Sequence, residues 1–149
     1  MPFTKNLRIS LLVLIVMLAV LLSACTQTGE EELTLAPLSE MPADVQSAAA
    51  SVREAYQFAA ANPDAVKNVP CYCGCGSMGH TSNYSCYIQE VKPDGEVIFD
   101  SHALGCSICV DITRDVMKMT REGQSAADIR QMIDQTYSQY GPSNFPPAP

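Results

Sequence analysis

Pro70-Cys71-Tyr72-Cys73-Gly74-Cys75-Gly76 places three thiols at every second position of one short stretch. In an extended chain, residues two positions apart lie about 6.5–7 Å apart, which is the outer limit for joining two cysteines in a disulfide. We therefore expect these thiols to pair with distant cysteines or to converge on a soft metal ion. Gly74 and Gly76 can adopt left-handed backbone angles, which would let the chain turn tightly around such a centre.

Further potential ligands follow this stretch along the chain. The candidate metal ligands are Cys71, Cys73, Cys75, His80, Cys86, His102, Cys106 and Cys109. Six sulfurs and two imidazoles could supply two tetrahedral sites or one thiolate-bridged cluster, and soft thiolates favour Cu(I) and Zn(II) over Mg or Ca. Cys106 and Cys109 form a CxxC at a predicted helix start, where the helix dipole stabilises a thiolate.

Two other interpretations of the cysteines remain open. Three long-range disulfides, joining the three loop thiols to Cys86, Cys106 and Cys109, would each stabilise the domain by about 2–4 kcal/mol. A lowered thiol pKa at the CxxC would equally suit thiol–disulfide exchange by Cys106 and Cys109. The alternating spacing of the loop thiols and the two histidines favour metal binding, with copper ahead of zinc.

The N-terminus has the pattern of a targeting segment. Lys5 and Arg8 precede an apolar run from residue 9 to residue 22, and Leu22-Ser23-Ala24-Cys25 follows. Small residues before a cysteine are typical of a bacterial lipoprotein signal, and the run is short for a membrane span, which needs about 20 residues. We predict a signal peptide over residues 1–24 and lipidation of Cys25, which would hold the protein on the extracytoplasmic face of the cell membrane.

The charge of the predicted mature chain is strongly acidic. Loss of Lys5 and Arg8 leaves seven basic residues against 16 acidic ones, a formal net charge of −9. Such a chain is not expected to bind nucleic acid, or to bind anionic lipid through a basic patch. Its remaining six cysteines would face an oxidising space, where an even number in a small domain is typical of a disulfide framework.

The rest of the chain predicts an α+β fold that is mostly helical. Residues 25–40 are polar and acidic, as in a flexible tether, and a helix is expected from Pro42 to Asn62. After the cysteine-rich loop, residues 86–91 and 96–99 favour strands, and Pro93-Asp94-Gly95 between them predicts a β-hairpin.

Two further helices are expected after the hairpin. One begins near Cys106 and ends at Gly123, and the next is capped by Ser125 and ends before Gly141. The prediction is a small three-helix domain over residues 41–141, with one β-hairpin and a cysteine-rich loop, followed by a loose Pro-rich tail over residues 142–149.

Two resemblances to known families follow from these residues. Pro70-Cys71-Tyr72-Cys73-Gly74-Cys75 resembles the signature of the bacterial PCYCGC-motif lipoproteins. The likeness runs from the first helix to about Gly141 and includes Gly79-His80, Asn83, Cys86, Asp100-Ser101-His102, Gly105-Cys106 and Cys109. It implies a lipoprotein context and a heavy-metal role.

The C-terminal third is similar to the thiol subunit of the cytochrome c maturation (haem lyase) apparatus. The likeness rests on Cys106-Ser107-Ile108-Cys109, Gly123-Gln124-Ser125, Ile129-Arg130 and Tyr140-Gly141. It implies a membrane-tethered helical bundle in which Cys106 and Cys109 would exchange disulfides with an apocytochrome or a redox partner. This chain differs from that subunit in its four further cysteines and its upstream helix.

The predicted function is binding of a soft metal, copper or zinc, by a lipid-anchored extracytoplasmic protein. The role would be that of a chaperone, buffer or resistance factor rather than an enzyme, because the sequence shows no Ser-His-Asp arrangement, paired carboxylates or phosphate loop. A metal-receiving or redox protein is the expected partner. The alternatives are a thiol–disulfide oxidoreductase component in cytochrome or copper-centre maturation and a disulfide-stapled module that binds a partner.

Overall fold

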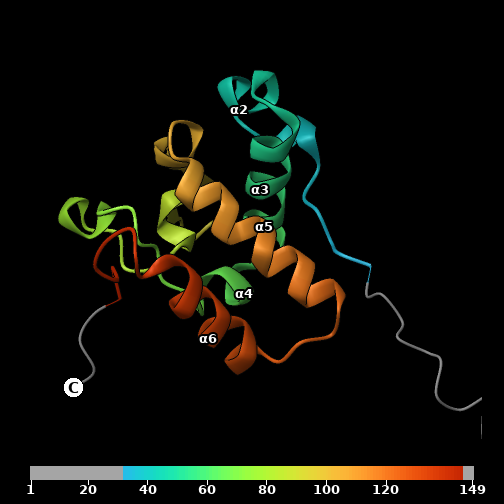
Figure 1. Ribbon diagram of the computed structural model, residues 1–149. Helices are drawn as coiled ribbons and strands as arrows, with labels where there is room; N and C mark the ends of the chain where they lie inside the picture. The colour runs from blue at the N-terminus through green and yellow to red at the C-terminus, as the bar shows by residue number, and fades with distance from the viewer. Residues whose placement is uncertain (1–31, 146–149) are drawn as a thin grey trace, which may run out of the picture.

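Helix α5 (Ser107–Arg121) lies at the centre of the computed structural model, which describes residues 32–145. It contacts α3 (Ala50–Ala61), α4 (Pro63–Lys67) and α6 (Ala126–Tyr137), which Figure 1 shows around it. The other elements are α2 (Ala43–Ser47), β1 (Ile88–Val91), β2 (Val97–Phe99) and the short 3-10 turns η1 (Leu38–Glu40), η2 (Cys75–Met78), η3 (Tyr84–Cys86) and η4 (His102–Leu104). This architecture confirms the predicted mostly helical α+β class.

The predicted first helix, over residues 42–62, is divided into α2 and α3. Ala48 and Ala49 have extended ψ angles of 175° and 151° between the two helices. The Ser47 hydroxyl donates to two carbonyls one turn back, at 2.8 and 3.2 Å, a contact that competes with regular helix bonding. Arg53 donates from Nη1 to the Ala48 carbonyl at 2.6 Å, which satisfies an acceptor that the break leaves without a helical partner.

Asn62 and Pro63 end α3 but do not end the helical region. Pro63 is the first residue of α4, a position that suits its fixed φ angle and its missing N–H. Val66 of this short helix is fully buried. The part of the chain that the structure describes therefore contains five α-helices where the sequence predicted three.

The helix boundaries after the hairpin follow from local capping. Gly123 has a φ of 71° just beyond α5, and Gln124 donates to the carbonyl of Met119 at 3.0 Å, as expected of a left-handed helix end. Ser125 caps α6, because its hydroxyl accepts from the Asp128 backbone N–H at 3.2 Å. Both predicted caps are therefore confirmed.

The predicted hairpin is present and leads the chain back to α5. β1 and β2 are antiparallel, and Lys92 donates to the Glu96 carbonyl at 2.8 Å across a turn in which Gly95 has a φ of 89°. Tyr56 of α3 packs edge-on against Tyr87, with ring centroids 4.9 Å apart. Because two strands alone are marginal in water, this aromatic contact with α3 helps to hold the hairpin on the helices.

A buried chain of hydrogen bonds ties the cysteine-rich loop to the first turn of α5. Asn83 donates to Thr113 Oγ1 at 2.7 Å, and Thr113 donates to the Tyr87 hydroxyl at 2.7 Å. That hydroxyl in turn donates to the Cys109 carbonyl at 2.8 Å. Asn83, Thr113, Tyr87 and Cys109 are each fully buried, so this chain fixes the backbone from which Cys109 projects.

The C-terminal segment returns to the cysteine-rich loop. The predicted loose tail of residues 142–149 is described only as far as Phe145, and within it Asn144 is buried. Asn144 donates its backbone N–H to the Cys71 carbonyl at 3.1 Å. The residues before position 146 therefore contribute to the folded domain.

The structure describes only part of the predicted targeting region. The signal peptide over residues 1–24 and the lipidated Cys25 lie outside the described residues, as does the tether as far as residue 31. Among residues 32–145, no helix is long and apolar enough to cross a membrane.

We expect Gly141→Ala to destabilise the fold, because an added Cβ would lie 2.8 Å from the Tyr72 carbonyl oxygen. Overpacking of this kind costs about 1–3 kcal/mol, to be measured by chemical denaturation. Gly105→Ala is the matched control, since a Cβ there meets nothing within 4 Å and the φ of −109° suits any residue. Equal unfolding midpoints for the two variants would contradict the close approach at Gly141.

Candidate metal centre

All eight predicted ligands lie beside the start of α5. Seven of them form two overlapping groups of four, in each of which the donor atoms lie within 4.8 Å of one another. The first group is Cys73, His102, Cys106 and Cys109, and the second is Cys75, His80, Cys86 and His102. Cys71 belongs to two further groups of three, one with Cys73 and Cys75 and the other with Cys86 and Cys109.

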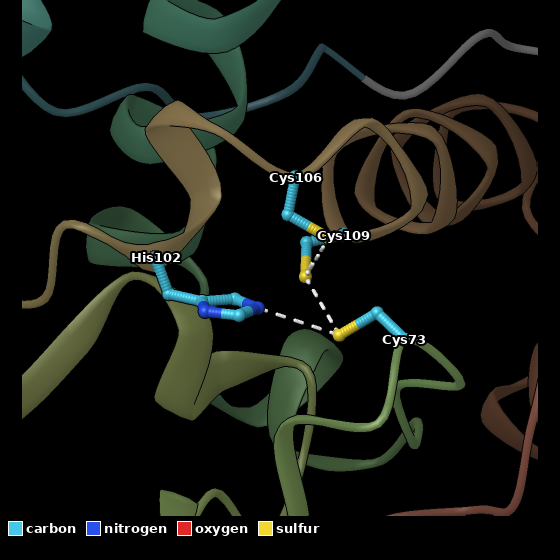
Figure 2. A group of neighbouring side chains, drawn as sticks. All are labelled: Cys73, His102, Cys106 and Cys109. Atoms are coloured by element: carbon cyan, nitrogen blue, oxygen red, sulfur yellow. Dashed lines mark hydrogen bonds between the residues drawn. The ribbon is translucent and has the colours of Figure 1, made fainter.

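The first group gathers donors from three segments, as Figure 2 shows. Cys106 caps α5 and Cys109 lies in its first turn, and this three-residue spacing puts both on one side of the helix. Their sulfurs are 3.1 Å apart. Cys73, from the loop, lies 3.6 Å from Cys109 Sγ, and its sulfur is 3.4 Å from His102 Nε2 of η4.

The second group lies on the other side of the loop and is more deeply buried. Cys75 and Cys86 have sulfurs 3.7 Å apart and are 2% and 0% exposed. His80 is buried beside them, and its ring stands edge-on to that of His102 with centroids 5.1 Å apart. His102 therefore adjoins both groups of donors.

His80 has one ring nitrogen with a neighbour and one without. Its Nε2 lies 3.5 Å from Asp100 Oδ2, whereas its buried Nδ1 has no hydrogen-bond partner. An unpartnered buried nitrogen is unusual and costly. A carboxylate beside one imidazole nitrogen is the common companion of a metal on the other, so a metal ion among the neighbouring sulfurs would satisfy Nδ1.

Asp100 contacts both histidine residues, and the sequence analysis assigned it no role. Its Oδ1 accepts the backbone N–H of His102 at 2.7 Å, while its Oδ2 faces His80. Its place directly before Ser101-His102 was visible in the sequence. Its proximity to His80, however, depends on how the hairpin packs.

The cysteine-rich loop does not run as an extended strand. Gly74 has a φ of 86°, as expected, and the sulfurs of Cys71 and Cys73 come within 3.3 Å of each other. Gly76 does not have the left-handed φ angle that the sequence allowed. Space around Gly76 is limited instead, because a Cβ there would lie 3.3 Å from the Asn144 Cβ.

Asn144 holds this loop in place and was missed by the sequence analysis. Its Oδ1 accepts the Cys71 N–H at 2.6 Å. Its Nδ2 donates to the Ser82 carbonyl at 3.1 Å and to Cys75 Sγ at 3.4 Å. No local pattern in the Pro-rich C-terminal region indicates this role.

The thiols differ in their readiness to lose a proton. Hydrogen bonding with the Cys71 side chain lowers the pKa of Cys109 to about 6, and the Cys86 side chain acts in the same direction. Burial raises the pKa of Cys73, and a neighbouring Cys109 thiolate raises it further. Cys109 therefore loses its proton more readily than Cys73 and is the natural first ligand for a cation.

Fold and site together define a small helical domain built around a buried cysteine- and histidine-rich centre. The chain belongs to the family described as "Protein of unknown function with PCYCGC motif", which matches residues 14–149. This match confirms the family resemblance inferred from the sequence. Comparison with curated proteins and with solved structures produced no match.

In the reduced, metal-free protein, we expect one thiol to titrate near pH 6, measured by ultraviolet thiolate absorbance. The pKa of Cys109 in the unfolded chain is about 8.5. This thiolate therefore stabilises the fold fully above pH ~8.5, and the contribution is lost as the pH falls through the folded pKa of about 6.

Cys109→Ser should remove this titration step, and Cys106→Ser should keep it, because the Cys106 thiol acts to raise the pKa of Cys109. A step near pH 6 that persists in Cys109→Ser would contradict the assignment.

Proposed function

We propose that this protein is a lipid-anchored extracytoplasmic protein that binds a soft metal ion through its Cys/His cluster and acts as a metal chaperone, buffer or resistance factor. The observation that carries the proposal is the convergence of six sulfurs and two imidazoles in one largely buried volume. We propose copper ahead of zinc as the ion that this cluster binds.

The spacing of the sulfurs supports a metal rather than a disulfide framework. Cys106, Cys71 and Cys73 have sulfurs 3.1, 3.3 and 3.6 Å from Cys109 Sγ. A disulfide joins two sulfurs at about 2.05 Å and gives each sulfur one partner. Four ligands around zinc at about 2.3 Å are separated by about 3.8 Å in a tetrahedron. A sulfur with several neighbours near that separation suits a shared ion better than a single bond.

The burial of Cys109 argues against thiol–disulfide exchange as the main role. An attacking sulfur must be both ionised and accessible to the partner's disulfide. Cys109 is the thiol whose pKa falls to about 6, and it is 0% exposed. Cys106 is half-buried at the start of α5, so exchange through Cys106 stands as the second candidate, with a redox protein as partner.

The preference for copper over zinc rests on the proposed location of the site outside the cytoplasm. Thiolates and imidazoles suit Cu(I) and Zn(II), and a Cys3His set such as the first group is also used for structural zinc. A thiolate-rich site outside the cytoplasm suits the capture of copper for a metal-receiving partner. The formal charge of −9 on the predicted mature chain would draw cations towards it.

The proposed anchoring rests on the N-terminal sequence. Lys5 and Arg8, the apolar run after them and the small residues before Cys25 form a lipoprotein signal pattern. Lipid on Cys25 would consume that thiol and leave the six cysteines of the domain for the metal. The role would be that of a binding protein on the outer face of the cell membrane, not an enzyme.

We expect the reduced full chain carrying Cys25→Ser to withdraw Cu(I) from a coloured chelator, with Zn(II) tested in parallel. Loss of an outer-shell partner weakens metal binding by about 10–100-fold. Cys109→Ser removes a direct ligand and should therefore weaken binding by more than this. Met78→Leu is the matched control, since Met78 is 58% exposed and outside both groups of four ligands. The metal proposal would be contradicted if all six cysteines are found in disulfides and no metal binds after their reduction.

We expect the unsubstituted protein, but not Cys25→Ser, to take up a labelled fatty acid in bacteria. The variant should keep the mass of the precursor, because processing at this site follows lipid attachment. Labelling and mass spectrometry of the membrane fraction measure both effects. A Cys25→Ser protein of mature mass in that fraction would contradict lipid anchoring, while Cys73→Ser should be labelled and processed normally.

A further inference from the structure

We propose that the centre holds two soft metal ions and that the Cys71 thiolate bridges them. This inference rests on the proposed metal-binding function and adds its stoichiometry and internal arrangement. Four-coordinate sites are the rule for zinc bound by cysteine and histidine. Two such ions that share one sulfur need seven donors, and the chain offers eight in this volume.

The first ion has three sulfur ligands of its own besides Cys71. Cys106 and Cys109 come from one turn of α5, and Cys73 joins them from the loop. His102 lies against this set, because its Nε2 is 3.4 Å from Cys73 Sγ, and it can serve as a hydrogen-bonding partner of that sulfur. The donor atoms of these four residues are within 4.8 Å of one another.

The second ion then has three ligands of its own. They are Cys75, His80 and Cys86, since His102 lies against Cys73 of the first set. The unpartnered Nδ1 of His80 is independent support for an ion at this place. With Asp100 beside Nε2 of the same ring at 3.5 Å, His80 has the outer-shell carboxylate typical of a metal ligand.

Cys71 is the one donor placed to serve both ions. Its sulfur lies 3.3 Å from the sulfurs of Cys73 and Cys109 in the first set. It also lies within 4.8 Å of those of Cys75 and Cys86 in the second. As a bridge it supplies the fourth ligand of each ion.

Charge balance also favours a second ion. Cys75 and Cys86 are 2% and 0% exposed, and a buried thiolate that has neither a cation nor hydrogen bonds is strongly disfavoured. One ion bound by the first set leaves Cys75 and Cys86 unbound. A second cation lets these sulfurs ionise and ligate instead of remaining as buried thiols, which are weak hydrogen-bond donors.

An opening beside the second set offers an entry path. A hollow of about 450 Å³ is lined by Gly74, Gly76, His80 and Asn144, among others. His80 thus lies between this hollow and the sulfurs of Cys75 and Cys86 that complete its group. The second ion can therefore reach its ligands without passing through the first site.

The test uses Cd²⁺ as a soft probe ion and the reduced full chain carrying Cys25→Ser, so that only the six domain cysteines remain. Native mass spectrometry should find two cadmium ions per chain. Cadmium-113 NMR should show two resonances that split each other, because two ions that share one sulfur are coupled through it.

Cys71→Ser should abolish the splitting. It should also allow a chelator to remove the second Cd²⁺ under conditions in which the unsubstituted chain keeps both ions. Cys106→Ser is the matched control, since it removes a terminal thiolate and should shift one resonance while the splitting persists. The splitting in the unsubstituted chain tests the bridge even if Cys71→Ser fails to fold.

The outcomes separate the two proposals. One tightly bound Cd²⁺ would overturn the two-ion centre and leave the metal-binding function standing. Two ions without mutual splitting would overturn the bridge. No bound Cd²⁺ would overturn the metal-binding function itself.

Discussion

The gathering of six thiols in one largely buried volume is the constraint on which the rest of this structure depends. Four of the sulfurs, those of Cys71, Cys75, Cys86 and Cys109, belong to residues at most 2% exposed. Such sulfurs must share protons, bond to one another or share cations, since none can be hydrated. The six sulfurs of the domain approach one another at 3.1–3.7 Å, and a bound ion would stabilise the fold as well as the site.

The groups that hold the cysteines are the same groups that hold the fold together. The chain of hydrogen bonds from Asn83 through Thr113 and Tyr87 ends on the Cys109 carbonyl. Asn144 bonds to the backbone of Cys71 from the far end of the domain. Loosening either contact would disturb the packing and the ligand geometry together, so stability and ion binding are coupled in this domain.

Sequence reasoning predicted well wherever the signal was local. The Ser125 cap, the left-handed Gly123 and the turn before Glu96 each depend on neighbouring residues, and each is confirmed. The break at Ala48 was missed, because it depends on side-chain contacts of Ser47 and Arg53 that compete with a good helical pattern. Asn144 was missed for a different reason: its partner Cys71 lies 73 positions away.

The sequence by itself determined the supply of donors, namely six thiols and two imidazoles with the softness that copper or zinc requires. It also determined that Cys106 and Cys109 lie on one turn of a helix. Only the tertiary structure decided how the donors group, that Cys71 lies between the groups and that Asp100 faces His80. Spacing constrains neighbours along the chain, whereas contacts between distant segments are set by how the loop and hairpin pack against α5.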